Sequence, residues 1–318
     1  MTDVQDSLVT VLALNPAVDI SYEIPQLIEY QKVCASNTWH HPGGNGINVT
    51  RALAMLSVPV HCCSVTGGES GEMLLRLLGD GIGEQYTWFH IHGETRVNTT
   101  LLQKNPPGQY EITSSGPNVP PDVLERVCSC FVESAGGGIA VLTGQLPSGV
   151  PDSLYRDLAE RVSGQGGSVV VDAHGPELQY ALETAPCLVR LNQYVLEMYM
   201  KRRLEDLQQV ADAARMIQQR GINFLCVSLG QDGAILTDAD DTWHCEAPKV
   251  HKQSTVGCGD ALVAGLIAEL RRGGTPEEML RFGVICGSAT ASKPGTGLFE
   301  RDEVDTASLD LKISSLGI

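Results

Sequence analysis

The sequence of 318 residues predicts an α/β fold built on a doubly wound, mostly parallel β-sheet. Short runs rich in Val, Leu and Cys are apolar throughout instead of alternating with polar residues, which is typical of strands buried on both faces. Segments with a helical spacing of apolar residues separate these runs, as in sheets whose parallel strands are joined by crossover helices. The composition agrees, since 42% of the residues are hydrophobic and 19% are charged.

Seven stretches are expected to form the strands of this sheet, namely 7–14, 59–65, 139–143, 168–172, 187–191, 224–228 and 234–237. The expected helices are 47–57, 69–78, 121–132, 151–162, 204–220, 258–272 and 276–293. Two further stretches, 20–39 and 86–112, show partial alternation and no long helical pattern, which predicts extra strands. We expect these strands to form a small β-lid on a single domain spanning 1–318, because no linker or internal repeat divides the chain.

Charge and cysteine content limit the classes of partner. The chain carries 22 Lys and Arg against 38 Asp and Glu, a net charge of −16, with no run of five basic residues. We therefore expect neither nucleic acid nor a membrane as a partner. The beginning of the chain lacks a basic signal region, and the ten cysteines include no C-x-x-C pair. These features favour a cytoplasmic protein with reduced cysteines.

The segment 253–260 (QSTVGCGD), directly before an apolar helical run, is the strongest candidate for a catalytic site. Gly257 and Gly259 allow the backbone to turn with its N–H groups outward, and the helix that starts there adds partial positive charge. Such a turn suits an anion. Asp260 follows in the first helical turn, where a carboxylate can accept a proton from a hydroxyl. The alternative is a glycine-rich turn in which Asp260 only caps the helix.

A second glycine cluster, 42–48 (PGGNGIN), precedes the helix expected at 47–57. Gly43 and Gly44 would admit a ligand against the backbone, and Asn48 offers a donor and an acceptor to sugar hydroxyls. A loop before a helix explains the same residues. No Lys-Ser/Thr pair follows, which excludes a P-loop. Asp19 and Arg96 are weaker candidates, because a strand-end aspartate often forms a turn and an isolated arginine is often a structural partner.

These motifs occur in an order that resembles the PfkB, or ribokinase-like, family of carbohydrate kinases over nearly the whole chain. The resemblance rests on the segments 15–19, 43–48, 95–98, 144–149, 227–233 and 254–260, and continues through 277–284 and 287–291. It implies a ribokinase-like fold and transfer of a phosphoryl group from ATP to a sugar phosphate, most specifically fructose 6-phosphate. It also implies Mg²⁺, leaves room for a monovalent cation, and suggests a homodimer in which the β-lids of two chains pair.

The resemblance implies roles for individual residues. Asp260 would be the catalytic base, and the backbone of Gly257, Cys258 and Gly259 would form an anion hole. The sugar phosphate would be held by Asp19, Lys32 of the partner's lid, Gly43, Gly44, Asn48, Arg96, Asn98 and Gln145. The nucleotide would lie along Asn192, Ser228, Gly230, Gly233, Gly295 and Gly297.

Three positions depart from the family pattern. Asn45 replaces a lysine of the kinases for fructose 1-phosphate and tagatose 6-phosphate, which favours fructose 6-phosphate or another sugar. Gln145 replaces a serine near the substrate phosphate. The family's Asn-x-x-Glu magnesium motif reads Asn192-Gln-Tyr-Val195 here, with Glu197 as the remaining candidate metal ligand. A kinase for another sugar phosphate, a kinase for a plain sugar or nucleoside, and a weakly active ligand-binding relative are therefore alternatives.

Overall fold

The computed structural model describes residues 7–79, 85–306 and 311–317, and the expected domain from 1 to 318 includes residues outside these ranges. The main sheet of the described part consists of β1 (Val9–Ala13), β4 (Val60–Thr66), β5 (Tyr86–His90), β8 (Ile139–Thr143), β9 (Ser168–Asp172), β10 (Leu188–Asn192), β11 (Phe224–Ser228), β12 (Ala234–Thr237), β13 (Thr242–Cys245) and β14 (Ile313–Ser315). Their order is β14-β13-β12-β11-β10-β9-β8-β1-β4-β5. All pairs from β5 to β11 are parallel, and only the pairs from β11 to β14 are antiparallel. The expected mostly parallel sheet is confirmed.

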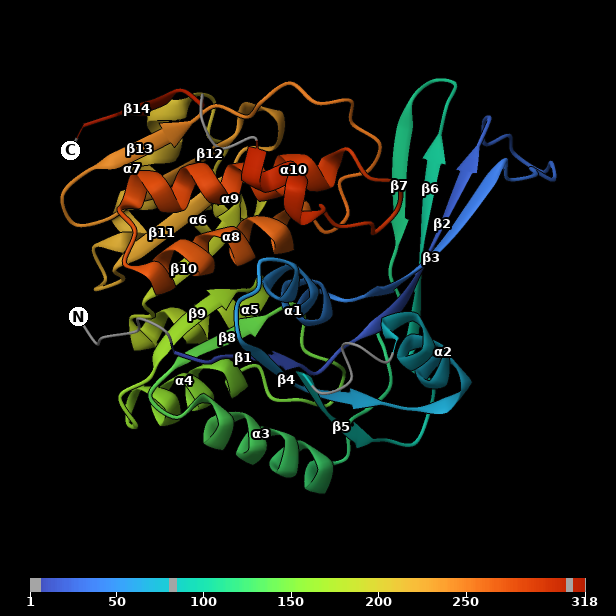
Figure 1. The fold of residues 1–318 in the computed structure, drawn as a ribbon, viewed down its shortest axis with the longest axis horizontal. Coiled ribbons are helices and arrows are strands. Elements are labelled where there is room, and N and C mark those ends of the chain that lie inside the picture. The colour runs from blue at the N-terminus through green and yellow to red at the C-terminus, as the bar shows by residue number, and fades with distance from the viewer. Residues whose placement is uncertain (1–6, 80–84, 307–310, 318) are drawn as a thin grey trace.

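Helices cover both faces of this sheet, as the doubly wound prediction requires (Figure 1). One face carries α1 (Asn45–Met55), α2 (Gly68–Leu78), α8 (Cys258–Arg272), α9 (Pro276–Ala291) and α10 (Arg301–Thr306). The other carries α3 (Pro121–Ala135), α4 (Leu154–Ser163), α5 (Gly175–Ala181), α6 (Gln193–Met200) and α7 (Leu207–Gln218). Within β1, Val9 and Val11 contact the first core and Leu12 the second, which explains why this strand is apolar at every position. Among the described residues, no helix is long and apolar enough to cross a membrane.

The helix that carries Asp260 is held in place by close packing of α8 against α9. A Cβ added to Gly265 of α8 would lie 2.8 Å from the Cα of Gly283 on α9, so both positions require the absence of a side chain. The start of α9 is fixed by a capping box in which Thr275 and Glu278 each accept a backbone N–H of the other residue. The N-terminus of α8 therefore has a firm support.

A second sheet of four strands stands out from the body as a lid (Figure 1). Its strands are β2 (Ala17–Ile24), β3 (Asn37–Gly43), β6 (Arg96–Gln103) and β7 (Gly108–Ile112), in the order β3-β2-β6-β7. The expectation that all of 86–112 belongs to the lid is wrong for its first part, because β5 pairs with β4 at the edge of the main sheet. Partial alternation marks any half-exposed strand, and β5 is such an edge strand.

Candidate active site

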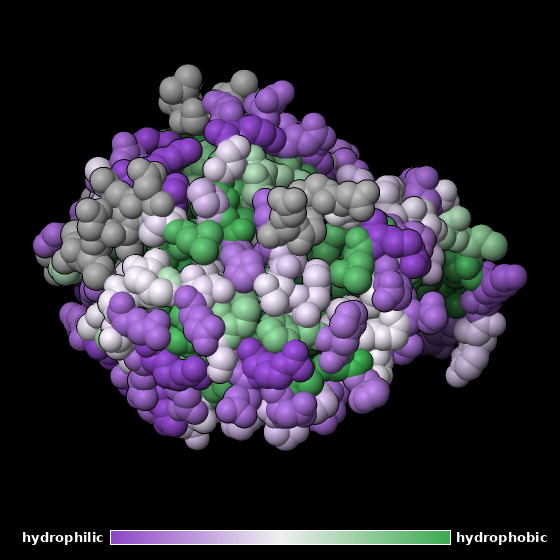
Figure 2. Space-filling view, turned by 60° about the horizontal axis from the view of Figure 1, so that its bottom comes forward, coloured by the Kyte–Doolittle hydropathy of each residue, from purple (hydrophilic) through white to green (hydrophobic). Residues whose placement is uncertain are grey.

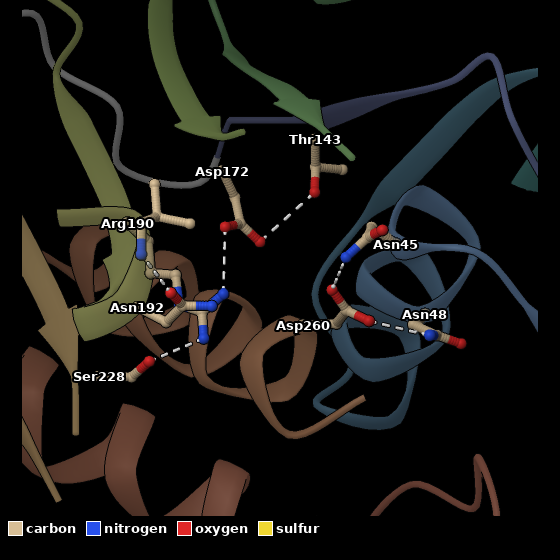
Figure 3. Close-up of polar contacts among 9 residues, drawn as sticks. Asn45, Asn48, Thr143, Asp172, Arg190, Asn192, Ser228 and Asp260 are labelled. Atoms are coloured by element: carbon tan, nitrogen blue, oxygen red, sulfur yellow. Dashed lines mark hydrogen bonds and ion pairs between the residues drawn. The ribbon is translucent and has the colours of Figure 1, made fainter. Parts of the chain in front are cut away.

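Asp260 lies at the centre of the candidate site, in the first turn of α8 (Figure 3). Its carboxylate is buried and accepts hydrogen bonds of 2.8 Å from the side-chain amides of Asn45 and Asn48, both on α1. Burial, followed by the charge of Asp172, raises the pKa of Asp260 from its ordinary value of 3.8 to about 6, although the two amides and Arg190 oppose the rise. Asp260 is therefore ionised at neutral pH and suited to accept a proton from a hydroxyl.

The turn before Asp260 has the geometry expected of an anion-binding helix N-terminus. Gly257 is the N-cap of α8 with φ +82°, a left-handed conformation that favours glycine. A Cβ on Gly259 would overlap the guanidinium of Arg190, so a larger residue there would displace that side chain. Burial raises the pKa of the Cys258 thiol to about 12, which keeps it neutral. Residues 257–259 thus offer backbone N–H groups at the positive end of a helix of 15 residues.

Arg190, with its ion-pair partner Asp172, faces this turn from the sheet (Figure 3). The sequence analysis did not single out Arg190. Nη1 of Arg190, on β10, lies 3.2 Å from Oδ1 of Asp172 at the end of β9, and Nη2 donates to Oγ of Ser228 at the end of β11 over 2.8 Å. Burial alone would lower the pKa of Arg190, but Asp172 outweighs that effect and holds the pKa above its usual value. The only sequence signal was an arginine near the end of an otherwise apolar strand.

An open pocket of about 790 Å³ adjoins Arg190 and has the size of a nucleotide site. Its lining includes six of the residues predicted for the nucleotide or the anion hole, namely Asn192, Ser228, Gly230, Gly233, Cys258 and Gly259. Lys249 and Lys252 line it too and add positive charge that the sequence analysis had not assigned. Gly233 is forced to be glycine, because a Cβ there would overlap the backbone carbonyl of Cys245.

The predicted substrate residues meet on the lid side of Asp260. Asp19 on β2 is buried, and its carboxylate accepts hydrogen bonds of 2.8 Å from Nδ2 of Asn98 and from Oγ1 of Thr296. Burial raises the pKa of Asp19 against the opposing effects of these two donors. Gly43 lies flush against Asp19, since a Cβ there would overlap the carboxyl group. Gly44 begins α1 with φ +89°.

Arg96 and Gln145 border a separate small polar hollow beside α1, lined also by Asn15 and Asn45. Nε of Arg96 donates to the carbonyl of Asn15 over 3.1 Å, and Nη1 donates to the carbonyl of Ser114 over 3.2 Å. Arg96 is 9% exposed, while Gln145 is exposed. The arginine is thus held rigidly by the backbone at the edge of the substrate side, which places a buried positive charge there.

Gly295 and Gly297 are not where the sequence analysis expected them. Gly295 and Gly297 are not among the residues that line the nucleotide pocket, and Cβ atoms added to them would approach His41 at the root of the lid. The intervening Thr296 explains this placement, because its hydroxyl donates to Asp19. Lys32 is exposed in the segment between β2 and β3, and Figure 1 shows this segment at the end of the lid that points away from the main sheet. Its expected contact with the substrate side of a partner chain stays a prediction.

The expected magnesium motif supplies no carboxylate to the pocket. Asn192 accepts a hydrogen bond of 2.8 Å from the backbone N–H of Val195 and so caps α6. Oε1 of Glu197 accepts from the backbone N–H of Leu204 over 3.0 Å and is absent from the pocket lining. Glu197 as a metal ligand is therefore corrected to a carboxylate that fixes the end of α6. The residues present do not form the expected magnesium site.

The lid touches the anion-binding turn directly. Nε2 of Gln109 on β7 donates to Oγ1 of Thr255 over 2.8 Å, and Oε1 of Gln109 accepts from the backbone N–H of Thr255 over 3.0 Å. Thr255 lies two residues before Gly257. One amide therefore joins the lid to the segment directly before the turn.

A buried carboxylate at a helix N-terminus, beside a nucleotide-sized pocket and a lid, is the geometry of a phosphotransferase. The chain belongs to the pfkB family of carbohydrate kinases, whose family model matches residues 8–302. It is accordingly an enzyme that transfers a phosphoryl group to a sugar hydroxyl.

Two curated relatives of this chain are phosphofructokinases. The ATP-dependent 6-phosphofructokinase isozyme 2 of Escherichia coli (strain K12) is 32% identical over 299 residues, which cover 92% of this chain and 95% of the relative. The 1-phosphofructokinase of the same organism is 29% identical over 299 residues, covering 93% and 95%. The crystal structure of phosphofructokinase-2 from Escherichia coli in complex with substrates and products superposes with a TM-score of 0.86 at 31% identity, covering 94% of this chain and 97% of that chain.

Proposed function

We propose that the protein phosphorylates a hydroxyl of a sugar phosphate with ATP, and that fructose 6-phosphate is its substrate. The observation that carries the proposal is the position of Asp260. Its ionised carboxylate lies between the anion-binding turn with its adjoining pocket and the cluster of Asp19, Asn98 and Arg96. A base so placed can accept the hydroxyl proton while the turn holds the transferred group.

In the proposed reaction, groups of this chain act on the attacking hydroxyl and on the transferred phosphoryl group. Asp260 takes the proton of the attacking hydroxyl, and Asn45 and Asn48 hold its two oxygens so that one lone pair faces the substrate. The backbone of residues 257–259 and the guanidinium of Arg190 stabilise the negative charge on the phosphoryl group. Because the expected magnesium carboxylate is missing, no step is assigned to a protein-bound metal.

Arg96 supports a phosphorylated sugar over a plain one. Its buried charge is the kind of group that binds phosphate through charge-assisted hydrogen bonds. The names of the curated relatives favour fructose phosphates, and Asn45, which stabilises Asp260, occupies the place of a lysine in the kinases for fructose 1-phosphate and tagatose 6-phosphate. These two sugar phosphates and plain sugars or nucleosides are the alternatives to test.

The lid also supports a homodimer as the active form. Its exposed apolar side chains are Leu27, Ile28, Tyr30, Val97, Tyr110 and Ile112, and Figure 2 shows apolar atoms on the projecting part of the molecule. Burial of these side chains against the lid of a second copy would bring Lys32 of the partner subunit toward the substrate side. One neighbouring structure is described as the tetrameric inhibited form of phosphofructokinase-2 from Escherichia coli, so one protein of similar structure forms an oligomer.

The test is release of ADP from Mg·ATP in the presence of six acceptors: fructose 6-phosphate, fructose 1-phosphate, tagatose 6-phosphate, fructose, ribose and adenosine. Potassium is included, because a neighbouring phosphofructokinase-2 structure contains it. Turnover on fructose 6-phosphate that is lost in Asp260→Asn supports the proposal. ATP binding without turnover on any acceptor would instead favour a weakly active ligand-binding relative, a reading that Val195 motivates.

A further inference from the structure

Arg51 is a buried arginine next to the site that no role described so far uses. It lies on α1 and is only 8% exposed. Asn45, Asn48 and Arg51 follow one another at intervals of three residues, so they share one side of the helix. That side faces Asp260, to which both asparagines donate. Burial of an arginine is costly without partners, so its contacts indicate what it does.

The hydrogen bonds of Arg51 end on three neutral oxygens. Its Nη1 lies 2.9 Å from the carbonyl of Pro42, 3.3 Å from Oδ1 of Asn48 and 3.5 Å from the carbonyl of Thr296. Pro42 is in the last lid strand before α1, and Thr296 is the residue whose hydroxyl donates to Asp19. One guanidinium therefore contacts the root of the lid, the loop that holds Asp19 and an amide that holds Asp260.

The contact with Asn48 determines which way its amide points. An amide has an oxygen that accepts and a nitrogen that donates, and a guanidinium can only donate. Arg51 and the Asp260 carboxylate, which can only accept, therefore favour the same orientation, in which Oδ1 faces Arg51 and Nδ2 donates to Oδ2 of Asp260 over 2.8 Å. In the flipped orientation the amide oxygen would face the carboxylate and repel it.

Burial lowers the pKa of Arg51 and raises the pKa of Asp260, so it disfavours the charged form of both groups. Tyr86, Asp19 and Asp260 oppose this effect on Arg51. The titratable and charged groups that face the pair are Asp19, His41 and Tyr86 around Arg51, and Asp172, Arg190 and Cys258 around Asp260.

We propose that Arg51 is a positioning residue for phosphoryl transfer, which acts by fixing the Asn48 amide in the orientation that holds Asp260 ready to accept the substrate proton. The proposal rests on the proposed role of Asp260 as the base. It assigns Arg51 no contact with substrate. Its effect travels through one hydrogen bond to Asn48 and a second from Asn48 to Asp260.

The test replaces Arg51 by Met, which keeps an unbranched apolar chain and removes the donors. In Arg51→Met we expect the acidic limb of kcat/KM against pH to move up by about one pH unit or more, because Asp260 loses a correctly oriented donor to its charged form. Arg51→Lys keeps a charged donor near Oδ1 of Asn48, so its acidic limb should stay at the wild-type position. An unchanged limb in Arg51→Met overturns the proposal.

A double-mutant cycle separates positioning from a purely structural role. If Arg51 acts mainly through Asn48, then Arg51→Met moves the acidic limb much less in the Asn48→Ala background, where only its direct charge effect on Asp260 remains, than in the wild-type background. Additive shifts would overturn the proposal. The matched control is Arg215→Met, which removes a half-buried arginine that donates to Thr242 and to the carbonyl of Gly317, and it should leave the limb unchanged.

A second readout does not need activity. The pKa of Asp260 can be followed from the pH dependence of unfolding, by comparing each Arg51 variant with and without Asp260→Asn. A pKa that rises in Arg51→Met but not in Arg51→Lys supports the positioning role even if no tested sugar is phosphorylated, in which case only the proposed function fails. If Arg51→Met does not fold, Arg51→Gln replaces it, since its amide can present either end to Asn48; a pKa equal to that of Arg51→Lys would overturn the proposal.

Discussion

Replacement of Asp260 by Asn should change how the stability of the protein depends on pH. The pKa of Asp260 is raised from 3.8 to about 6 in the folded protein, so the folded state binds more protons than the unfolded state between these values. Stability from this group is therefore present at low pH and is lost as the pH rises through about 6. The full shift corresponds to about 3 kcal/mol, and roughly half of it falls between pH 5 and pH 8.

The assay is urea unfolding of the wild type and of Asp260→Asn at pH values from 5 to 8. The free energy of unfolding of the wild type minus that of the variant should fall by roughly 1 kcal/mol over this range and level off above pH 7. A constant offset reflects only the contacts of the new amide with Asn45 and Asn48, so the slope carries the result. A difference that is flat, or that grows with pH, would refute the assignment of a raised pKa to this carboxylate.

Three further changes test other parts of the account. Arg96→Ala should raise the KM for a phosphorylated sugar by a factor that corresponds to roughly 1.5 to 3 kcal/mol and leave the KM for a plain sugar nearly unchanged. If steady-state kinetics show the same rise in KM for both sugars, Arg96 has only a structural role. Gly265→Ala should lower the free energy of unfolding by about 1 to 3 kcal/mol, because the new methyl group meets the backbone of α9. The control is Gly108→Ala, which should lower the free energy of unfolding far less in the same denaturation experiment, because a Cβ has room there. Gln109→Ala should lower kcat with little change in global stability, because it removes the two bonds that join the lid to Thr255; a wild-type kcat would contradict this role of the lid.

The main sheet was predictable because most of its buried strands are visible in the sequence as short runs of apolar residues. A strand such as β8 is buried at all five positions, and its run of apolar residues has no other reading than a strand covered on both faces. The strands β13 and β14 escaped prediction, because they lie at an antiparallel edge where half-exposed positions weaken the pattern. The same ambiguity assigned β5 to the lid.

The candidate site was predictable where function is carried by glycine or by a helix terminus. Position 257 favours glycine because of its left-handed backbone conformation, and position 43 because it lies against Asp19. Glycines at such positions can be recognised in the sequence. Arg190 and Arg51 were missed, because each acts through partners far away in the chain, such as Asp172 and Thr296. Only the folded structure brings these pairs together.

Asn45 illustrates how a single position can be misjudged from sequence. Its type was noted only as the absence of a lysine found in the kinases for fructose 1-phosphate and tagatose 6-phosphate. In the structure its amide donates to Oδ1 of Asp260, so the residue holds the proposed base. Asn45 and Asp260 are 215 positions apart in the chain, so no local sequence pattern indicates their hydrogen bond.

The most direct test of the account is transfer of the labelled γ-phosphoryl group from Mg·ATP to fructose 6-phosphate in a single turnover, measured by rapid quench for the wild type and for Asp260→Asn, with ATP affinity measured in parallel. The account predicts transfer by the wild type and a rate at least about 100-fold lower in the variant, with ATP affinity retained, because only the base has been removed. Transfer by Asp260→Asn at nearly the wild-type rate would contradict the assignment of Asp260 as the base, and binding of ATP by the wild type without transfer to fructose 6-phosphate would contradict the proposed substrate.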